Sequence, residues 1–195
     1  LPLGTAEISM WDFANAYTTL ASNGYKKDLG VILKVTDMHG NILYEKKNNS
    51  TQVLNSNYTF ILNEMLTATY NSAFIDYNTP TIISLGSKIS RKYAMKTGSS
   101  GTDCYMIGYN PDILMLVWNG YDDNRQMNPV DGNISKNIWV NTVEEYLKDK
   151  EARWYDVPEN VVGVPLDAIT GNQAVNDKKM YVYYYVKGSE YVNSE

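Results

Sequence analysis

The sequence predicts an α+β fold in which helices pack against an antiparallel sheet. Strand-like residues on both sides of a Gly-Ser-Ser-Gly turn at 98–101 predict a hairpin. Residues 113–118 form a nearly continuous apolar run of strand length. Residues 9–22, 56–70 and 134–147 place apolar side chains at helical spacing, so these segments are expected to cover the sheet.

The first helix is expected to begin at Ser9. Ser9 and Asp12 have the spacing of a capping box, in which side chains satisfy the free N–H groups of the first turn. The pair Asn23-Gly24 is a common stop signal. The helix should therefore end near Ser22.

A β-hairpin is expected next, with strands at 31–35 and 42–44. Gly40 and Asn41 between them suit the positive φ of a tight turn. His39, the only histidine, is interpreted as a turn residue, because one His and one Cys cannot form a zinc site.

The second helix is predicted over residues 56–70, with Ser56 as the candidate N-cap. Its apolar residues recur at three- and four-residue spacing, which indicates an amphipathic helix. Residues 73–90 contain Pro80 and Gly86 and are expected to form an irregular loop near the functional site.

The apolar run at 113–118 is typical of a strand covered on both faces, so it is expected to be a central strand. Residues 124–133 are expected to form a loop. The closing helix should turn one apolar face to the sheet, made of Ile134, Ile138, Trp139, Val143 and Leu147.

A charged run at 148–153 indicates a boundary near residue 150. Beyond it, residues 164–169 and 180–186 are strand-like and predict a short β-rich appendage. Alternating tyrosines on the second of these strands are expected to pack, with sugar stacking as the alternative. They are Tyr181, Tyr183 and Tyr185.

Composition restricts the class of protein. The chain has 195 residues, 44% hydrophobic and 20% charged, which suits a globular protein with a core. The net charge of −5 and the dispersed basic residues argue against nucleic acid as a partner. No apolar run is long enough to span a membrane. The single cysteine, Cys104, is interpreted as a small buried hydrophobe.

The segment Lys96-Thr97-Gly98-Ser99 is the candidate functional site. The two hydroxyls can hold a carboxylate, and the lysine adds a cation nearby. Gly98 has no side chain to block a ligand that approaches the strand. The alternative is an exposed strand lysine beside glycines that only form a turn.

Lys-Thr-Gly is one of three motifs of penicillin-binding proteins and serine β-lactamases. The chain resembles the penicillin-binding transpeptidases far beyond this triplet, and the resemblance covers nearly all of it, from Leu3-Gly4 onward. The similar segments include Asp103-Cys104-Tyr105, Gly108-Tyr109-Asn110-Pro111, Val117-Trp118-Asn119-Gly120 and Val186-Lys187-Gly188-Ser189-Glu190. The last of these resembles the tail of class A, bifunctional members.

The resemblance implies a partial transpeptidase fold, with residues 1–150 as the C-terminal portion of the transpeptidase domain and 151–195 as a small β-rich extension. It implies serine acyl transfer that cross-links peptidoglycan stem peptides, acylation by β-lactams, no metal or other cofactor, and a place on the extracytoplasmic face of a bacterial membrane with the anchor upstream. Lys96, Thr97, Gly98 and Ser99 would then be catalytic, the first, second and fourth binding substrate, and the backbone N–H of Ser99 would be an oxyanion donor. Ser9, Asp103 and Trp118 would be structural supports.

The chain contains no Ser-x-x-Lys, the motif that carries the family's nucleophile. Ser135-Lys136-Asn137 matches Ser-x-Asn but follows the Lys-Thr-Gly turn instead of preceding it, so the match is interpreted as chance. Since Leu1 to Gly4 resembles the region beyond both motifs, the chain is expected to be part of a longer protein and inactive alone. Exposed strand edges predict self-association of the isolated chain.

Two alternatives remain. A serine β-lactamase shares the triplet, but the long chain after Trp118 argues against it. A catalytically silent cell-wall binding or scaffold module would keep the fold without the chemistry.

Overall fold

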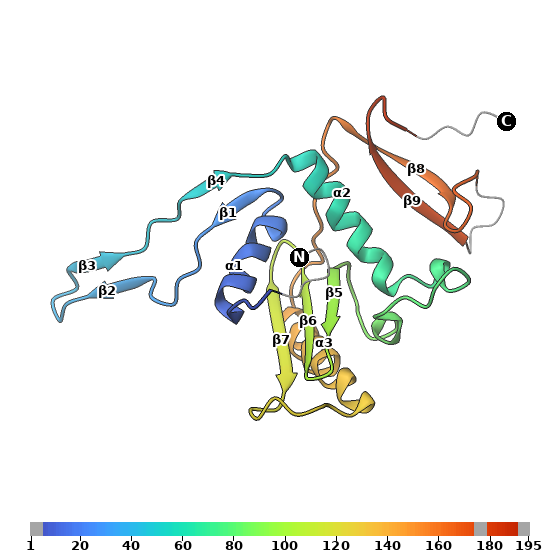
Figure 1. Ribbon diagram of the computed structural model, residues 1–195. Helices are drawn as coiled ribbons and strands as arrows, with labels where there is room; N and C mark the ends of the chain where they lie inside the picture. The colour runs from blue at the N-terminus through green and yellow to red at the C-terminus, as the bar shows by residue number, and fades with distance from the viewer. Residues whose placement is uncertain (1–5, 174–178, 191–195) are drawn as a thin grey trace.

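The computed structural model describes residues 6–173 and 179–190 (Figure 1). Leu1 to Gly4, part of the family resemblance, lie outside the described residues. The α-helices are α1 (Met10–Ala21), α2 (Ser56–Thr67) and α3 (Ile134–Leu147), and short 3-10 helices are η1 (Ala68–Tyr70), η2 (Ser72–Phe74), η3 (Ile83–Leu85) and η4 (Pro129–Asn133). The strands are β1 (Tyr25–Lys27), β2 (Lys34–Thr36), β3 (Ile42–Glu45), β4 (Ser50–Gln52), β5 (Ala94–Ser99), β6 (Asp103–Tyr109), β7 (Leu114–Gly120), β8 (Val161–Asp167) and β9 (Met180–Val186).

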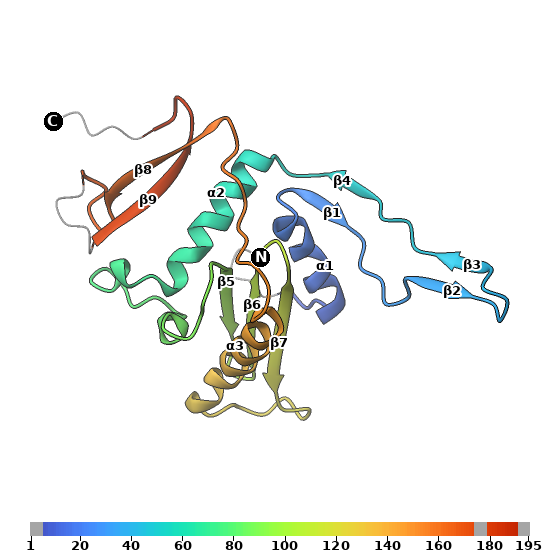
Figure 2. The ribbon, with the colours of Figure 1, turned by 180° about the vertical axis from the view of Figure 1, so that it is seen from behind.

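The central sheet is antiparallel, in the order β5-β6-β7. Helix α3 covers one face, while α1 and α2 lie on the other, as Figures 1 and 2 show from opposite sides. The prediction of an α+β fold with helices packed on an antiparallel sheet is therefore confirmed. The prediction that the apolar run at 113–118 is the central strand is wrong. Among the described residues β7 pairs only with β6, because an apolar run reports burial and not the number of ladder partners.

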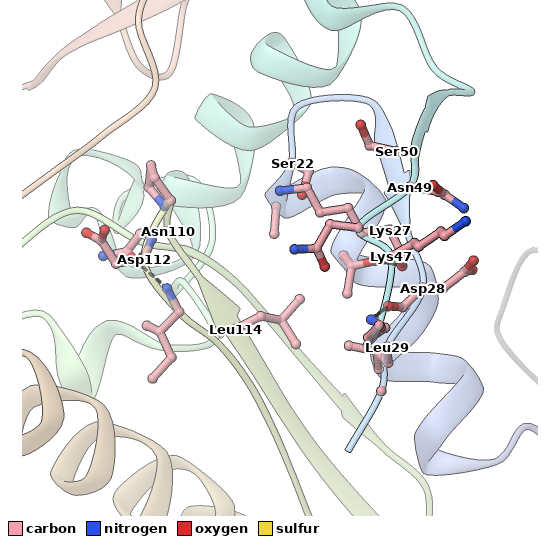
Figure 3. A pocket seen from close by; sticks show the side chains of 17 residues that line it. Ser22, Lys27, Asp28, Leu29, Lys47, Asn49, Ser50, Asn110, Asp112 and Leu114 are labelled. Atoms are coloured by element: carbon pink, nitrogen blue, oxygen red, sulfur yellow. Dashed lines mark hydrogen bonds between the residues drawn. The ribbon is translucent and has the colours of Figure 1, made fainter. Parts of the chain in front are cut away.

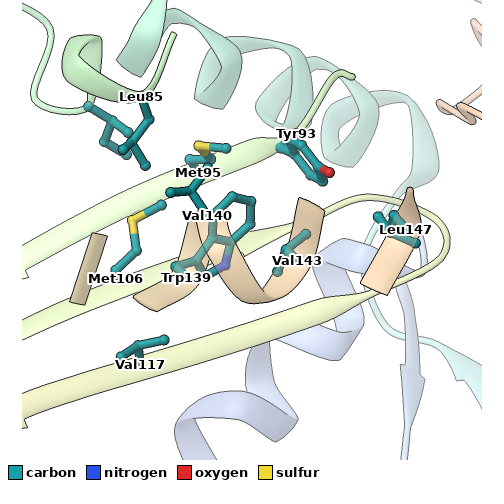
Figure 4. Packing of buried hydrophobic residues seen from close by; sticks show 10 residues of the cluster. Leu85, Tyr93, Met95, Met106, Val117, Trp139, Val140, Val143 and Leu147 are labelled. Atoms are coloured by element: carbon teal, nitrogen blue, oxygen red, sulfur yellow. The ribbon is translucent and has the colours of Figure 1, made fainter. Parts of the chain in front are cut away.

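The main core lies between the sheet and α3 (Figure 4). Trp139 is fully buried, and its indole N–H donates to the Met115 carbonyl at 3.1 Å. The ring occupies the space that a side chain at Gly108 would need, since a Cβ there would lie 2.4 Å from a ring carbon. The other buried members of this cluster are Ile82, Leu85, Tyr93, Met95, Met106, Val117, Val140, Val143 and Leu147.

The predicted buried face of α3 is only partly correct. Trp139, Val143 and Leu147 are buried, but Ile134 and Ile138 are each 44% exposed. Ser135 and Val140, rather than Ile134 and Ile138, are the other residues of α3 that are buried. The choice between adjacent residues at a helix edge depends on the strand surface opposite, which hydrophobicity alone does not encode.

The predicted helix starts are correct at Ser9 and one residue late at Ser56. The Ser9 hydroxyl accepts the N–H of Asp12 at 3.1 Å, as an N-cap should. In α2 the cap is Asn55, whose side chain accepts the N–H of Asn57 at 2.9 Å. Ser56 is the first helical residue of α2.

The buried face of α2 is more polar than its sequence suggests. Leu62 and Met65 are 39% and 61% exposed, whereas Asn63 and Glu64 are buried. The Asn63 side chain accepts from the Tyr109 hydroxyl at 2.8 Å and donates to the Leu20 carbonyl at 3.0 Å. These bonds compensate for burial of the amide and join α1, α2 and the central sheet.

Between α1 and α2 the chain forms a long protruding arm, residues 25–52 (Figure 1). The predicted hairpin is present here as β2 paired with β3, and His39 lies in its turn with its N–H bonded to the Asp37 carboxylate at 2.8 Å. Large apolar side chains of the arm face solvent, including Val31 at 84% and Met38 at 92% exposure. The arm therefore adds little to the core.

The β-rich appendage is the antiparallel pair β8 and β9. Two of the alternating tyrosines, Tyr181 and Tyr183, pack as predicted: Tyr181 contacts the Phe74 ring edge to face at 4.9 Å, and its hydroxyl donates to the Glu64 carbonyl at 2.8 Å. The Tyr183 hydroxyl donates to the Ala168 carbonyl at 2.9 Å. None of the helices in the described ranges is long and apolar enough to cross a membrane.

Candidate functional site

Lys96-Thr97-Gly98-Ser99 ends strand β5, and the chain returns along β6 as the sequence predicts. The hairpin closes through the Ser100 N–H, which donates to the Asp103 carbonyl at 2.9 Å. The Ser100 hydroxyl accepts the N–H groups of Thr102 and Asp103 at 3.1 and 3.0 Å. These local bonds hold the turn, and the Met127 N–H adds a hydrogen bond to the Gly101 carbonyl at 2.9 Å.

Strand alternation divides the motif between the two faces of the sheet. Thr97 and Ser99 share a face with Met95, which is buried against α3. Lys96 and Gly98 belong to the opposite face, and the exposed Lys96 ammonium donates to the Thr97 carbonyl at 2.5 Å. The structure thus brings the two hydroxyls together and sets the Lys96 side chain apart from them.

Gly98 has no packing reason to be glycine. A Cβ built there would meet Tyr105 at 3.8 Å, an ordinary van der Waals distance. This differs from Gly108, three residue pairs further along the β5–β6 ladder, where the Trp139 ring fills the space. The backbone at Gly98 is therefore open to the approach of a ligand.

Strand β5 is also an edge strand. Within the described residues it pairs with β6 on one side only, so its other side has backbone N–H and C=O groups free of a sheet partner. An extended peptide can add to such an edge through main-chain hydrogen bonds. The Lys-Thr-Gly-Ser segment lies at the end of this edge.

A cavity of about 300 Å³ adjoins the motif. Its lining includes Thr97, Gly98 and Ser99 of β5, with Thr81, Asn133 and Lys136 facing them. The Lys136 ammonium donates to the Thr81 carbonyl at 2.9 Å, which ties the loop before β5 to the start of α3. The predicted loop at 73–90 therefore does border the site, but Lys136 was not predicted as a site residue.

The triplet Ser135-Lys136-Asn137 does not act as a unit. Ser135 is buried, Lys136 reaches the cavity, and the Asn137 side chain accepts from Lys88 at 3.3 Å. The three side chains lie in different surroundings, which agrees with the interpretation of the Ser-x-Asn match as chance.

Asp103 anchors the returning strand. Its carboxylate accepts from the Trp118 indole N–H at 2.8 Å and from the Thr102 and Ser100 hydroxyls at 2.7 and 3.0 Å. These hydrogen bonds lower the pKa of Asp103, and the bond from Trp118 has the largest effect. Asp103 and Trp118 thus cross-link β6 to β7 beside the turn, in keeping with the supporting role expected of them.

Cys104 is buried, as the sequence predicts. Desolvation raises the pKa of its thiol above the ordinary value, so the unreactive protonated form is favoured. Although Cys104 borders the cavity, it is a poor candidate for a nucleophile.

A larger cavity, about 580 Å³, lies between the end of α1, the base of the arm and the turn from β6 to β7 (Figure 3). It is lined by charged groups such as Lys27, Asp28 and Asp112, and no residue of the Lys-Thr-Gly-Ser segment borders it. The Asp112 carboxylate is paired with Arg153 at 2.8 Å. The smaller cavity beside β5 is therefore the candidate site.

No family model matches the chain. Among curated proteins it is 33% identical, over 195 residues, to penicillin-binding protein 2D of Bacillus subtilis (strain 168), covering 99% of this chain and 28% of that protein. It is 26% identical over 171 residues to penicillin-binding protein 1A of Neisseria meningitidis serogroup A, covering 83% of this chain and 21% of that protein.

Among solved structures, the crystal structure of penicillin-binding protein 1A from Haemophilus influenzae matches with a TM-score of 0.84. The match covers 99% of this chain and 34% of that one, at 20% sequence identity. At this identity the likeness shows the shared fold. The chain spans about a third or less of the length of each protein compared.

Proposed function

The chain is a relative of penicillin-binding proteins over nearly all of its length, and on this premise we propose that it supplies the substrate-binding strand of a peptidoglycan D,D-transpeptidase. The observation that carries the proposal is the Lys-Thr-Gly-Ser segment on a free sheet edge beside an open cavity. Residues 1–150 would form the C-terminal portion of the transpeptidase domain, and 151–195 a β-rich extension.

In this proposal an extended stem peptide, or a β-lactam in its place, lies along the edge of β5. Because Gly98 has no side chain, the backbone of the ligand can come close to the strand. The Thr97 and Ser99 hydroxyls hold the terminal carboxylate, and the backbone N–H of Ser99 donates to the oxyanion. Lys96, on the opposite face from these hydroxyls, assists proton transfer by groups from outside this chain.

Acyl transfer also needs a nucleophile and its base. The 195 residues contain no Ser-x-x-Lys to provide them. We therefore propose that the chain is inactive alone and acts within a longer protein on the extracytoplasmic side of a bacterial membrane, without a cofactor.

The first test is labelling by a fluorescent penicillin, read by intact-protein mass spectrometry. We expect the full-length gene product to be acylated and the isolated chain to remain unlabelled. If neither is labelled although both are folded, a catalytically silent cell-wall binding module is the better assignment.

Substitutions at two glycines, Gly98 and Gly108, make this test more specific. In the full-length protein Gly98→Ala should leave the melting temperature unchanged, because a Cβ fits there, yet slow acylation by about 100-fold, because the ligand backbone is displaced. Gly108→Ala is the matched control, with a melting temperature lowered by the clash with Trp139. Normal acylation of Gly98→Ala would contradict the proposed role of the β5 edge.

We also propose that the isolated chain self-associates. Within the described residues both β5 and β7 have one unpaired side, and such edges template strand pairing between molecules. Static light scattering should give a mass that rises with protein concentration. A mass that stays monomeric at the highest soluble concentration would refute self-association.

A further inference from the structure

The larger cavity, of about 580 Å³, lies away from the Lys-Thr-Gly-Ser segment and takes no part in the proposed function (Figure 3). Three lysines of the arm line it, Lys27, Lys46 and Lys47. Within the described residues, no carboxylate lies at ion-pair distance from any of these three ammonium groups. The chain as a whole carries a net charge of −5, so this local group of cations is a departure that favours an anionic ligand.

The two carboxylates that also line the cavity have cations of their own. Asp28 pairs with Lys26 at 4.0 Å, and Asp112 pairs with Arg153 at 2.8 Å. Neither Lys26 nor Arg153 borders the cavity. These outer cations offset the two negative charges, so the three lysines dominate the charge inside the cavity.

Lys46 is held in place at the base of the arm. Its ammonium donates to the Asp28 carbonyl, and its stem packs on Gly30, where a Cβ would lie 2.7 Å from that side chain. An ammonium has three N–H donors, so this bond leaves capacity for a ligand oxygen. The ammonium groups of Lys27 and Lys47 make no hydrogen bond to the part of the chain that the structure describes, so they are also open to a ligand.

The wall opposite the arm contains a donor and an acceptor that lack partners (Figure 3). Asn110 is 1% exposed, and its side-chain oxygen accepts the N–H groups of Asp112 and Ile113 at 3.0 and 3.1 Å. Nδ2 of Asn110 and Oδ2 of Asp112 make no hydrogen bond within the described residues. Because buried polar atoms without partners are costly, and because a hydroxyl both donates and accepts, a ligand with hydroxyl groups suits this wall.

We propose that this cavity binds the phosphate ester of a polyol or sugar. The phosphate, with about two negative charges and three acceptor oxygens, lies against Lys27, Lys46 and Lys47. A carboxylate has a single charge and two oxygens, so it would use fewer of these donors. The hydroxyls of the ligand lie across the cavity, against Asn110 and Asp112. The volume of about 580 Å³ is within the range of small-ligand pockets.

NMR titration of the ¹⁵N-labelled chain tests this site with three probes, sn-glycerol 3-phosphate, inorganic phosphate and glycerol. We expect glycerol 3-phosphate to bind most tightly and glycerol to show no measurable binding. The side-chain NH₂ resonances of Asn110 and the backbone resonances of Lys27 and Lys47 should shift, while those of Thr97 and Ser99 stay unchanged. Shifts at Thr97 and Ser99 with none at Asn110 would overturn the inference.

Substitution of the lysines tests the contribution of each charge. Lys27→Met and Lys47→Met should each weaken the binding of glycerol 3-phosphate by about 10-fold, the size expected for one charge-assisted hydrogen bond. Lys26→Met is the matched control, because it removes the same charge from the same strand without bordering the cavity. It should bind nearly as tightly as the wild type. An equal loss in Lys26→Met and Lys27→Met would refute a defined site and leave only the general charge of the arm.

Asn110→Asp tests the opposite wall. It keeps an oxygen that can accept the N–H groups of Asp112 and Ile113, so the turn is retained, but it removes the Nδ2 donor. The advantage of glycerol 3-phosphate over inorganic phosphate should disappear in this variant. If the folded variant keeps the full advantage, the ligand hydroxyls do not lie against Asn110 and the assignment of this wall is wrong.

The same phosphate ester can belong to a soluble molecule or to a lipid headgroup. Flotation with vesicles of phosphatidylcholine and phosphatidylglycerol, whose headgroup is a glycerol phosphate, distinguishes these sources. Vesicle binding that Lys27→Met weakens would support the lipid, and binding of soluble glycerol 3-phosphate alone would support a soluble ligand. Binding of neither would overturn the inference, whereas the proposed function is decided separately by acylation of the full-length protein.

Discussion

Trp139→Ala should lower the free energy of unfolding by about 3–5 kcal/mol, the usual cost of truncating a buried tryptophan. The side chain is fully buried, packs edge to face on Tyr93 at 5.0 Å and fills the space above Gly108. Its removal leaves a cavity between α3 and β6, and the Met115 carbonyl loses its donor. The melting temperature should fall by on the order of 10 °C.

Urea unfolding followed by circular dichroism would measure this change, with Trp139→Phe as a milder variant if the alanine protein does not fold. Ile138→Ala is the matched control: it is the neighbouring residue, 44% exposed, and should cost less than about 1 kcal/mol. Equal losses at the two positions would mean that α3 presents the face expected from sequence.

Glu64→Ala should cost about 2–4 kcal/mol, because it removes a buried carboxylate that serves two partners. One oxygen accepts from the Lys92 ammonium at 2.5 Å, and the other from the Trp154 indole N–H at 2.6 Å. Glu64 is 4% exposed, whereas the Lys92 side chain is 38% exposed and can be rehydrated, which keeps the loss below that of a fully buried pair.

Glu145→Ala provides the comparison, since Glu145 pairs with Lys148 on the surface, where both side chains are more than half exposed. Such a pair contributes up to about 1 kcal/mol. The urea midpoint followed by circular dichroism should fall in Glu64→Ala and stay near the wild-type value in Glu145→Ala. If both alanine variants unfold at the same urea concentration, Glu64 does not join these segments energetically.

The parts of the fold that follow from short-range chemistry were predictable. The cap at Ser9 and the turn at 98–101 depend on residues within four positions of each other. The Lys-Thr-Gly-Ser segment could be found for the same reason, because its hydroxyls and its bare backbone lie on consecutive residues.

Features that depend on distant residues were not predictable. Lys136 comes 37 positions after Ser99 and reaches the cavity only because α3 packs across the sheet. The contact of Glu64 with Trp154 spans 90 positions. The inward turn of Val140 in place of Ile138 likewise reflects the strand surface opposite. In each case tertiary packing determines the contact, and the local sequence pattern does not predict it.

The arm has a practical consequence for protein engineering. At its tip Met38 is 92% exposed, and the turn from Asp37 to Asn41 is held by its own hydrogen bonds. Lengthening such a surface loop costs little loop-closure entropy. A fluorophore attachment site or an affinity peptide introduced at this tip would therefore report on the protein while leaving the β5 cavity and the α3 core intact.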